Sequence, residues 1–215
     1  MTEGAPPKSL KDQVRWQLWL LIAANFLLFF GFAKTDAILS AGFAGAMTGA
    51  TNLLPVGIAL VVTSVLNGQL TADVKARLVF LRWRYPLPGH RAFSLYGPGD
   101  PRIDMHRIYS SLGTKKPSTP AEENQAWYRM YKQVEHDSAV LHTHREFLLL
   151  RDYAAMAALF LVFGLVTFFL IDSWKAASLY LALLIVQFLV VRRAAANYGI
   201  RLVTTVLAIK AAARK

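Results

Sequence analysis

The chain has no cysteine, which excludes disulfide bonds, thiolate nucleophiles and cysteine-ligated metal sites. Charged residues are also few: 17% of the 215 residues are Asp, Glu, Lys or Arg, where a soluble domain carries about 25%. Acids are the scarcer kind, with 13 Asp and Glu against 24 Lys and Arg and a formal net charge of +11. Because some long stretches have almost no charge while others are dense with it, the composition indicates a protein divided between lipid and water.

Motifs that carry chemistry are missing too. The chain has no glycine-rich phosphate loop of the required spacing and no serine nucleophile elbow. His136, His142 and His144 are close in sequence, but facing pairs on a helix are three or four residues apart, so this spacing disfavours a metal site. Turn and helix-capping chemistry explains Asp100 and Asp104 better than acid–base catalysis does. We therefore expect no enzyme activity, no metal and no cofactor.

Four apolar stretches, at residues 16–32, 50–66, 153–171 and 177–191, predict membrane-spanning helices. The prediction is an all-α integral membrane protein, with four transmembrane helices in two helical hairpins and a mostly helical cytoplasmic segment between helices 2 and 3. Its expected parts are a cytoplasmic N-terminus (1–15), a first hairpin (16–67), a basic cytoplasmic segment (68–151), a second hairpin (152–192) and an amphipathic C-terminal helix (193–215). The last part either lies on the inner membrane surface or extends the fourth helix.

Lys and Arg are distributed unevenly between the connections. Thirteen fall between Asp73 and Arg151 and six between Arg192 and Lys215, whereas the other two connections carry one each. Since cytoplasmic loops collect Lys and Arg, the asymmetry predicts that both termini and the central segment face the cytoplasm. The expected location is a bacterial inner membrane, which the chain crosses several times.

Residues 33–49 are open to three interpretations: a loop, a re-entrant piece, or a helix that continues into the second span. Ala41, Gly45 and Gly49 recur at four-residue spacing, which suits close helix packing. A flexible turn of glycine and alanine is the alternative explanation.

The predicted spans hold polar side chains but no charged ones, which disfavours an ion-coupled carrier. On the second span, Asn52, Pro55, Ser64 and Asn67 are the candidate pore or hinge positions. Amides and hydroxyls at membrane depth also join helices to each other or to a second subunit, so both roles stay open.

The central segment has recognisable helix signals. Leu70, Val74, Leu78 and Leu81 follow helical spacing and predict a helix over 70–84 with this apolar face. Proline and glycine then predict a loop with one short helix near 103–112.

Thr119 followed by Pro120 predicts the start of the next helix. Because the segment has few runs able to build a core of its own, we expect a homo-oligomer in which helices 70–84 and 120–150 pack against neighbouring subunits.

Arginine and aromatic residues gather in the stretch RWRYPLPGHR. Arginine forks and aromatic faces suit phosphates and nucleobases. The alternative is a basic collar on anionic lipid headgroups. The expected partners are membrane lipids, an anionic nucleotide or nucleic-acid ligand, or a cytosolic protein, and the candidate ligand-binding residues are Arg82, Trp83, Arg84, His90 and Arg91.

The segments RWRYPLPGHRAFS, GDPRIDMHRI, NQAWYRMYKQ and HREFLLLRDYAA together resemble, in layout, parts of small multi-span bacterial inner-membrane proteins of the anti-phage-defence effector type. The resemblance implies an oligomeric effector or channel-like protein in antiviral defence. Its cytoplasmic basic surface would sense a ligand or partner and gate or perturb the membrane. The alternative function is a non-catalytic membrane anchor or scaffold subunit that recruits a cytosolic partner.

Overall fold

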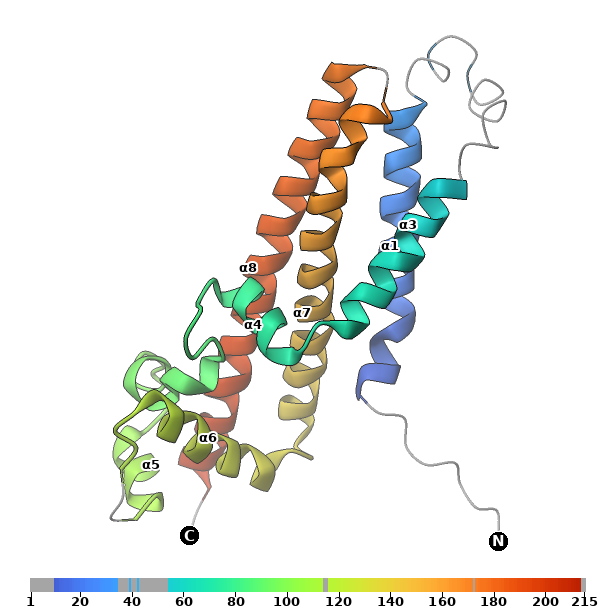
Figure 1. Ribbon diagram of the computed structural model, residues 1–215. Helices are drawn as coiled ribbons and strands as arrows, with labels where there is room; N and C mark the ends of the chain where they lie inside the picture. Colours follow the sequence, from blue (N-terminus) through green and yellow to red (C-terminus); the bar gives the residue numbers. More distant parts are fainter. Residues whose placement is uncertain are drawn as a thin grey trace, which may run out of the picture. The chain divides into compact units, whose positions relative to one another are not determined.

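A computed structural model describes residues 10–34, 39, 42, 54–113, 116–171 and 173–213. Every regular element in these residues is a helix or a helical turn and none is a strand, which confirms the all-α prediction (Figure 1). The elements are α1 (Leu10–Ala33), α3 (Leu54–Gln69), α4 (Ala72–Phe80), η2 (Pro88–Arg91), η3 (Ala92–Tyr96), α5 (Met105–Ser111), α6 (Pro120–Val134), α7 (Ser138–Gly164), η4 (Leu165–Phe169) and α8 (Trp174–Ala212).

Three of these helices, α1, α7 and α8, are long and apolar enough to cross a membrane. The predicted second span is represented by α3, which has 16 residues. At 1.5 Å per residue it covers roughly 24 Å, less than a hydrocarbon core of about 30 Å. The structure thus shows three of the four predicted helices at spanning length. The stripe of Ala41, Gly45 and Gly49 lies outside the described residues.

The chain divides into two compact units. The first, which we call the apolar unit, contains residues 1–71 and 152–191, and the second, the basic unit, contains residues 72–151 and 192–215. The long helices α7 and α8 each contribute residues to both units. Residues 72–151 of the predicted central segment and the predicted tail 193–215 therefore belong to one unit, while residues 68–71 belong to the apolar unit.

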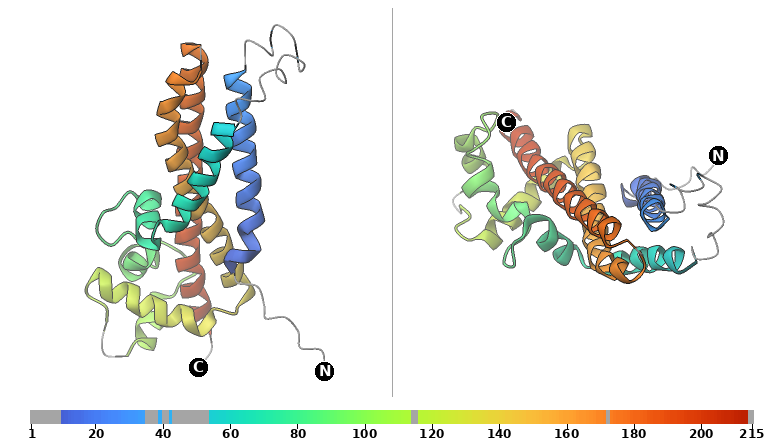
Figure 2. Two further views of the ribbon diagram at one scale, coloured as in Figure 1. Left: turned by 45° about the vertical axis from the view of Figure 1, so that its right-hand side comes forward. Right: turned by 90° about the horizontal axis from the view of Figure 1, so that it is seen from above.

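In the apolar unit, α7 and α8 are antiparallel neighbours (Figure 2). Gly164 permits their close approach, because a Cβ there would lie 2.7 Å from Leu184 Cδ1. The unit also has a small core whose largest members are Phe29, Phe160 and Tyr180.

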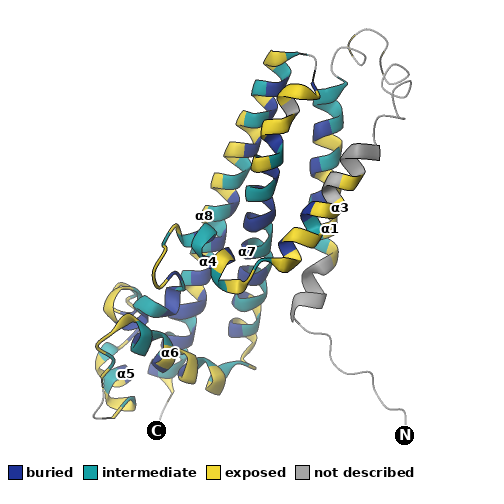
Figure 3. Ribbon diagram, viewed as in Figure 1, coloured by how far each residue is buried: buried dark blue, intermediate teal, exposed yellow. Residues whose placement is uncertain are grey.

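Many large apolar side chains of the same unit are nevertheless exposed, as the exposed positions along α3 and α8 illustrate (Figure 3). They include Leu27, Val61, Val162 and Val186. Apolar surface of this extent is unfavourable in water and is what a lipid-facing surface requires.

The basic unit has a core that the central segment shares with the end of α8. The end of α8 supplies the missing apolar surface: Val203, Val206 and Leu207 are fully buried against residues of the central segment such as Ile108 and Met130. Of the two alternatives for the tail, the structure shows the extension of the preceding helix, since α8 runs without a break to Ala212.

The helix predicted over 70–84 is shorter in the structure, Ala72–Phe80, and a different face of it is buried from the one we expected. α3 ends at Gln69 and α4 begins at Ala72. The buried side of α4 consists of Lys75, Ala76 and Val79, whereas Val74 and Leu81 are exposed. The apolar spacing was therefore misleading, because Lys75, Ala76 and Val79 form the buried side and none of them belongs to that spacing.

The predicted helix starts are confirmed. The Asp104 carboxylate accepts hydrogen bonds from the backbone N–H groups of His106 and Arg107 and so caps α5. Thr119 caps α6 by accepting from Glu122 N–H, with Pro120 at the first helical position. Local side-chain chemistry alone fixes these boundaries.

Candidate functional site

The five predicted ligand-binding residues lie in the basic unit, in and after the turn that follows α4. Two positions in this turn, Leu81 and Tyr85, have positive φ angles of 50° and 51°. Arg91 Nη1 donates to the Tyr85 carbonyl at 2.9 Å, and the rings of Tyr85 and His90 are 5.2 Å apart. These contacts hold an unusual backbone conformation in place.

The structure separates the five residues into two groups. Trp83 and Arg84 point into solvent, and Arg82 is half-buried beside them. His90 and Arg91 instead face their own segment, where His90 Nδ1 donates to the Leu87 carbonyl at 3.1 Å in the tautomer with that nitrogen protonated. Burial lowers the pKa of His90 below its usual value, because it disfavours the charged form of the ring. Ligand binding by the set stays a prediction.

Glu123 on α6 makes a structural contact with η3 that the sequence did not predict. Its side chain is only 7% exposed, and Oε2 accepts hydrogen bonds from the N–H groups of Phe93 at 2.8 Å and Ser94 at 3.1 Å. The carboxylate therefore fastens η3 to α6. Gly89 allows the same approach, because a Cβ there would clash with Asn124 and crowd Trp127. No local signal marks Glu123, since its partners lie 29 and 30 residues earlier.

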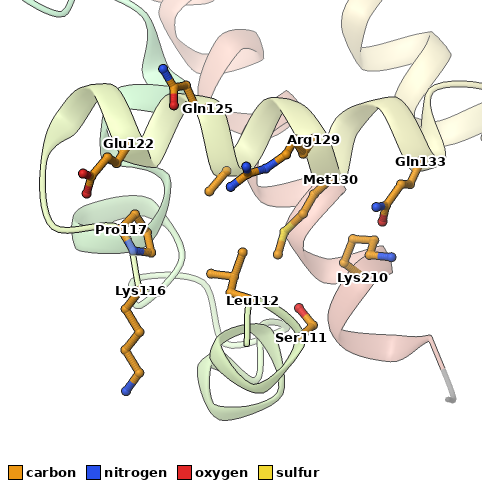
Figure 4. A pocket seen from close by; sticks show the side chains of 11 residues that line it. Ser111, Leu112, Lys116, Pro117, Glu122, Gln125, Arg129, Met130, Gln133 and Lys210 are labelled. Atoms are coloured by element: carbon orange, nitrogen blue, oxygen red, sulfur yellow. The ribbon is translucent and has the colours of Figure 1, made fainter. Parts of the chain in front are cut away.

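A pocket of about 430 Å³ lies on the other side of α6 (Figure 4). One wall is a single face of α6, where residues at four-residue spacing recur. The opposite wall comes from the end of α5 and the connection that follows it, and the end of α8 contributes one lysine. The lining residues are Ser111, Leu112, Lys116, Pro117, Glu122, Gln125, Ala126, Arg129, Met130, Gln133 and Lys210.

The pocket has an apolar floor and a basic rim. Leu112, Ala126 and Met130 supply the apolar surface. Of the basic residues, Lys116 turns away from the other labelled side chains in Figure 4 and places its Nζ 5.0 Å from the centre of the Tyr109 ring. Within the part of the chain that the structure describes, Arg129 and Lys210 have no ion-pair partner.

The carboxylate of Glu122 is engaged at the entrance of this pocket. It accepts hydrogen bonds from the backbone N–H and the hydroxyl of Ser118, at 2.8 and 2.9 Å. The rim consequently keeps an excess of positive charge. Sequence reasoning missed this site because Lys116, Arg129 and Lys210 stand on three separate segments up to 94 positions apart.

The candidate pore or hinge residues are only partly described. Asn52 lies outside the described residues, and Pro55 is the second residue of α3, where a missing N–H costs no helical hydrogen bond. Ser64 is half-buried. Asn67 is buried, and its Oδ1 has no hydrogen-bond partner in the described structure. An orphaned amide oxygen at that depth favours a contact with a further group.

The histidines of the central segment do not converge. His144 Nδ1 lies 3.0 Å from the Tyr131 hydroxyl, while His136 is exposed. In the described residues no three His, Asp or Glu side chains are placed to hold a metal ion.

Known proteins provide no assignment for this geometry: no protein family, no curated protein and no solved structure matches the chain.

Proposed function

We propose that the protein is an oligomeric membrane effector or channel-like protein, in which an anionic ligand bound by the basic unit biases the conformation of the apolar unit. One observation carries the proposal: α7 and α8 each belong to both units. A packed helix transmits rotation and translation along its length, so a change of packing at one end of α8 alters its other end.

The membrane arrangement that we propose has four spans, with α3 and residues that precede it as the second. The support is the apolar surface of α3, on which Ile58, Val61 and Val65 are exposed. The thirteen Lys and Arg between Asp73 and Arg151 support an orientation in which the basic unit faces the cytoplasm of a bacterium and the apolar unit lies in its inner membrane. A role in defence against phage is supported only by the resemblance in layout to effector proteins of that kind.

The pocket is the proposed sensor. Arg129 stands on α6 and Lys210 on α8, so an anion held by both neutralises their repulsion and ties α6 to α8. A ligand shifts a conformational equilibrium only when it binds one state more tightly than the other. Here the favoured state is the one that brings the two cations onto the same anion.

The homo-oligomer is proposed for the apolar unit, whose few helices enclose little volume in one chain. Ser64 is a half-buried polar residue of α3 that neighbouring subunits would share.

The test is ligand-dependent leakage from liposomes. The purified protein is reconstituted into vesicles that hold a self-quenching dye, and inorganic phosphate, adenosine nucleotides and a short single-stranded RNA are added as anionic probes. We expect at least one probe to release the dye. The double variant Arg129→Gln with Lys210→Gln should lose this release.

Lys132→Gln is the matched control, because Lys132 is an exposed cation on the same helix that pairs with Glu135 outside the pocket. Its release should equal that of the unmodified protein. Absence of leakage with every probe, together with absence of toxicity on overexpression, would refute the effector proposal. Co-purification of a stoichiometric soluble protein would then favour the anchor or scaffold function.

A further inference from the structure

The turn after α4 presents an alternating pattern on the surface of the basic unit. Its five residues are Leu81, Arg82, Trp83, Arg84 and Tyr85. The three apolar or aromatic side chains are 62%, 83% and 45% exposed, in chain order. In the described residues, neither arginine between them has an ion-pair partner. Such a large exposed aromatic surface is unfavourable in water and indicates a binding surface.

This tip is held in a fixed conformation. Leu81 N–H donates to the Arg77 carbonyl at 2.8 Å, and Arg91 donates to the Tyr85 carbonyl at 2.9 Å. The His90 ring lies against Tyr85, and Pro86 next to it is buried. The exposed side chains are thus presented by an ordered backbone, and binding needs to order little more than their rotamers.

Contacts inside the basic unit fasten the tip to particular residues of the long helices. Arg192 Nη1 donates to the Val79 carbonyl at 3.1 Å, two residues before the tip begins. Gly199 brings α8 against Phe80 and Phe147, since a Cβ would lie 2.8 and 2.9 Å from their rings. The tip is therefore anchored near Arg192.

Near this anchor, the composition of both long helices changes from apolar to basic residues. The apolar run of α8 ends at Val191, and Arg192 and Arg193 follow. On α7, Arg151 lies 5.9 Å from the centre of the Phe147 ring, two residues before the apolar run that starts at Tyr153. A change from apolar to basic residues marks the boundary between hydrocarbon and headgroups.

We propose that the Leu81–Tyr85 tip is a lipid-binding anchor, with Leu81 and Trp83 inserted at the headgroup boundary and Arg82 and Arg84 on the phosphates of anionic phospholipids. The amphipathic indole ring suits this level of a membrane, and guanidinium groups bind phosphate oxygens in pairs. Apolar side chains on both sides of each arginine favour a bilayer over a free nucleotide, which gives no partner for Leu81. The anchor goes beyond the proposed function, because it requires neither an anion in the pocket beside α6 nor leakage through the membrane.

The experiment follows Trp83 fluorescence in the full-length chain. The other four tryptophans are replaced by phenylalanine, and the protein is placed in nanodiscs of phosphatidylcholine alone or with about a third of phosphatidylglycerol. Lipids brominated near the headgroup report insertion, and aqueous acrylamide, which carries no charge and is not repelled by anionic lipid, reports exposure. The control is a variant that keeps only Trp127, which is half-buried and stacked on Tyr131 with ring centres 5.6 Å apart.

We expect brominated lipid to quench Trp83, with acrylamide quenching several-fold weaker in anionic than in neutral nanodiscs, and no such dependence for Trp127. Adding Arg82→Gln and Arg84→Gln to the Trp83 protein should weaken the effect of anionic lipid; Arg84 is exposed and Arg82 half-buried, and the circular dichroism spectrum checks the fold. Equal acrylamide quenching in both lipids, or the absence of quenching by brominated lipid, overturns the anchor. Protection of Trp83 by an added nucleotide or RNA in neutral nanodiscs also overturns it, in favour of a soluble anion.

Discussion

Replacing Glu123 with alanine tests whether one buried carboxylate holds η3 on α6. The substitution leaves two backbone N–H groups without an acceptor. Phe93 is itself buried, so its N–H cannot turn to water, and an unmade hydrogen bond of this kind costs about 1–3 kcal/mol. Ser94 is exposed and its N–H can be hydrated, so its loss is smaller, roughly 0.5–1 kcal/mol. We expect a total of about 2–4 kcal/mol of local stability to be lost.

The measurement is hydrogen exchange of the peptide that contains η3, followed by mass spectrometry with the protein in nanodiscs. A loss of about 2–4 kcal/mol accelerates exchange by roughly 30-fold to 1,000-fold, since about 1.4 kcal/mol corresponds to a factor of ten. Glu123→Gln is the matched control: it keeps an oxygen acceptor without the charge and should lose only about 1–2 kcal/mol. Acceleration below about threefold with alanine, or equal effects of alanine and glutamine, would contradict the reasoning.

Three further predictions concern packing, acid sensitivity and the tie between α4 and α8. Gly199→Ala should lower the free energy of unfolding of the basic unit by about 1–2 kcal/mol, because overpacking against Phe80 and Phe147 outweighs the gain in helix propensity. Adding Phe80→Leu should restore much of the lost stability, measured by thermal unfolding. Hydrogen bonds from Arg102 lower the pKa of Asp100 to about 2, so this pair stabilises the fold above about pH 4 and the contribution is lost as the pH falls toward 2. Because Arg102 is exposed, the effect is about 1 kcal/mol, and the melting temperature should fall less steeply with acid in Arg102→Gln. Arg192→Gln removes the donor to the Val79 carbonyl and should accelerate hydrogen exchange at the end of α4, up to the Leu81 N–H, roughly tenfold, whereas the exposed Arg193→Gln should not.

Features with a local cause could be predicted from the sequence. The cap at Asp104 needs only the backbone N–H groups two and three residues later, and Thr119 with Pro120 acts over the same distance. The long apolar helices could be predicted from composition, because a long run of apolar residues is unfavourable in water, and in lipid a helix satisfies all its backbone hydrogen bonds internally.

Features with a distant cause could not be predicted. From the sequence, Glu123 is an acidic residue in the first turn of a helix, and the helix dipole alone is enough to account for an acid at that position. Its actual partners, Phe93 and Ser94, become neighbours only when η3 packs on α6. The buried face of α4 is a similar case: the apolar spacing favours Val74 and Leu81, but tertiary packing covers Ala76 and Val79 instead.

The division of the basic unit into residues 72–151 and 192–215 has a consequence for the order of synthesis. Leu202, Val203, Val206, Leu207 and Ala211 complete a core whose other members were made before residue 151. The ribosome adds residues 152–191 in between, and these are the apolar parts of α7 and α8. At about 5–20 residues per second, Ile108 and Met130 wait several seconds for their partners. The basic unit therefore finishes folding only after residues 152–191 have been synthesised, so a folded basic unit shows that both apolar stretches have already left the ribosome.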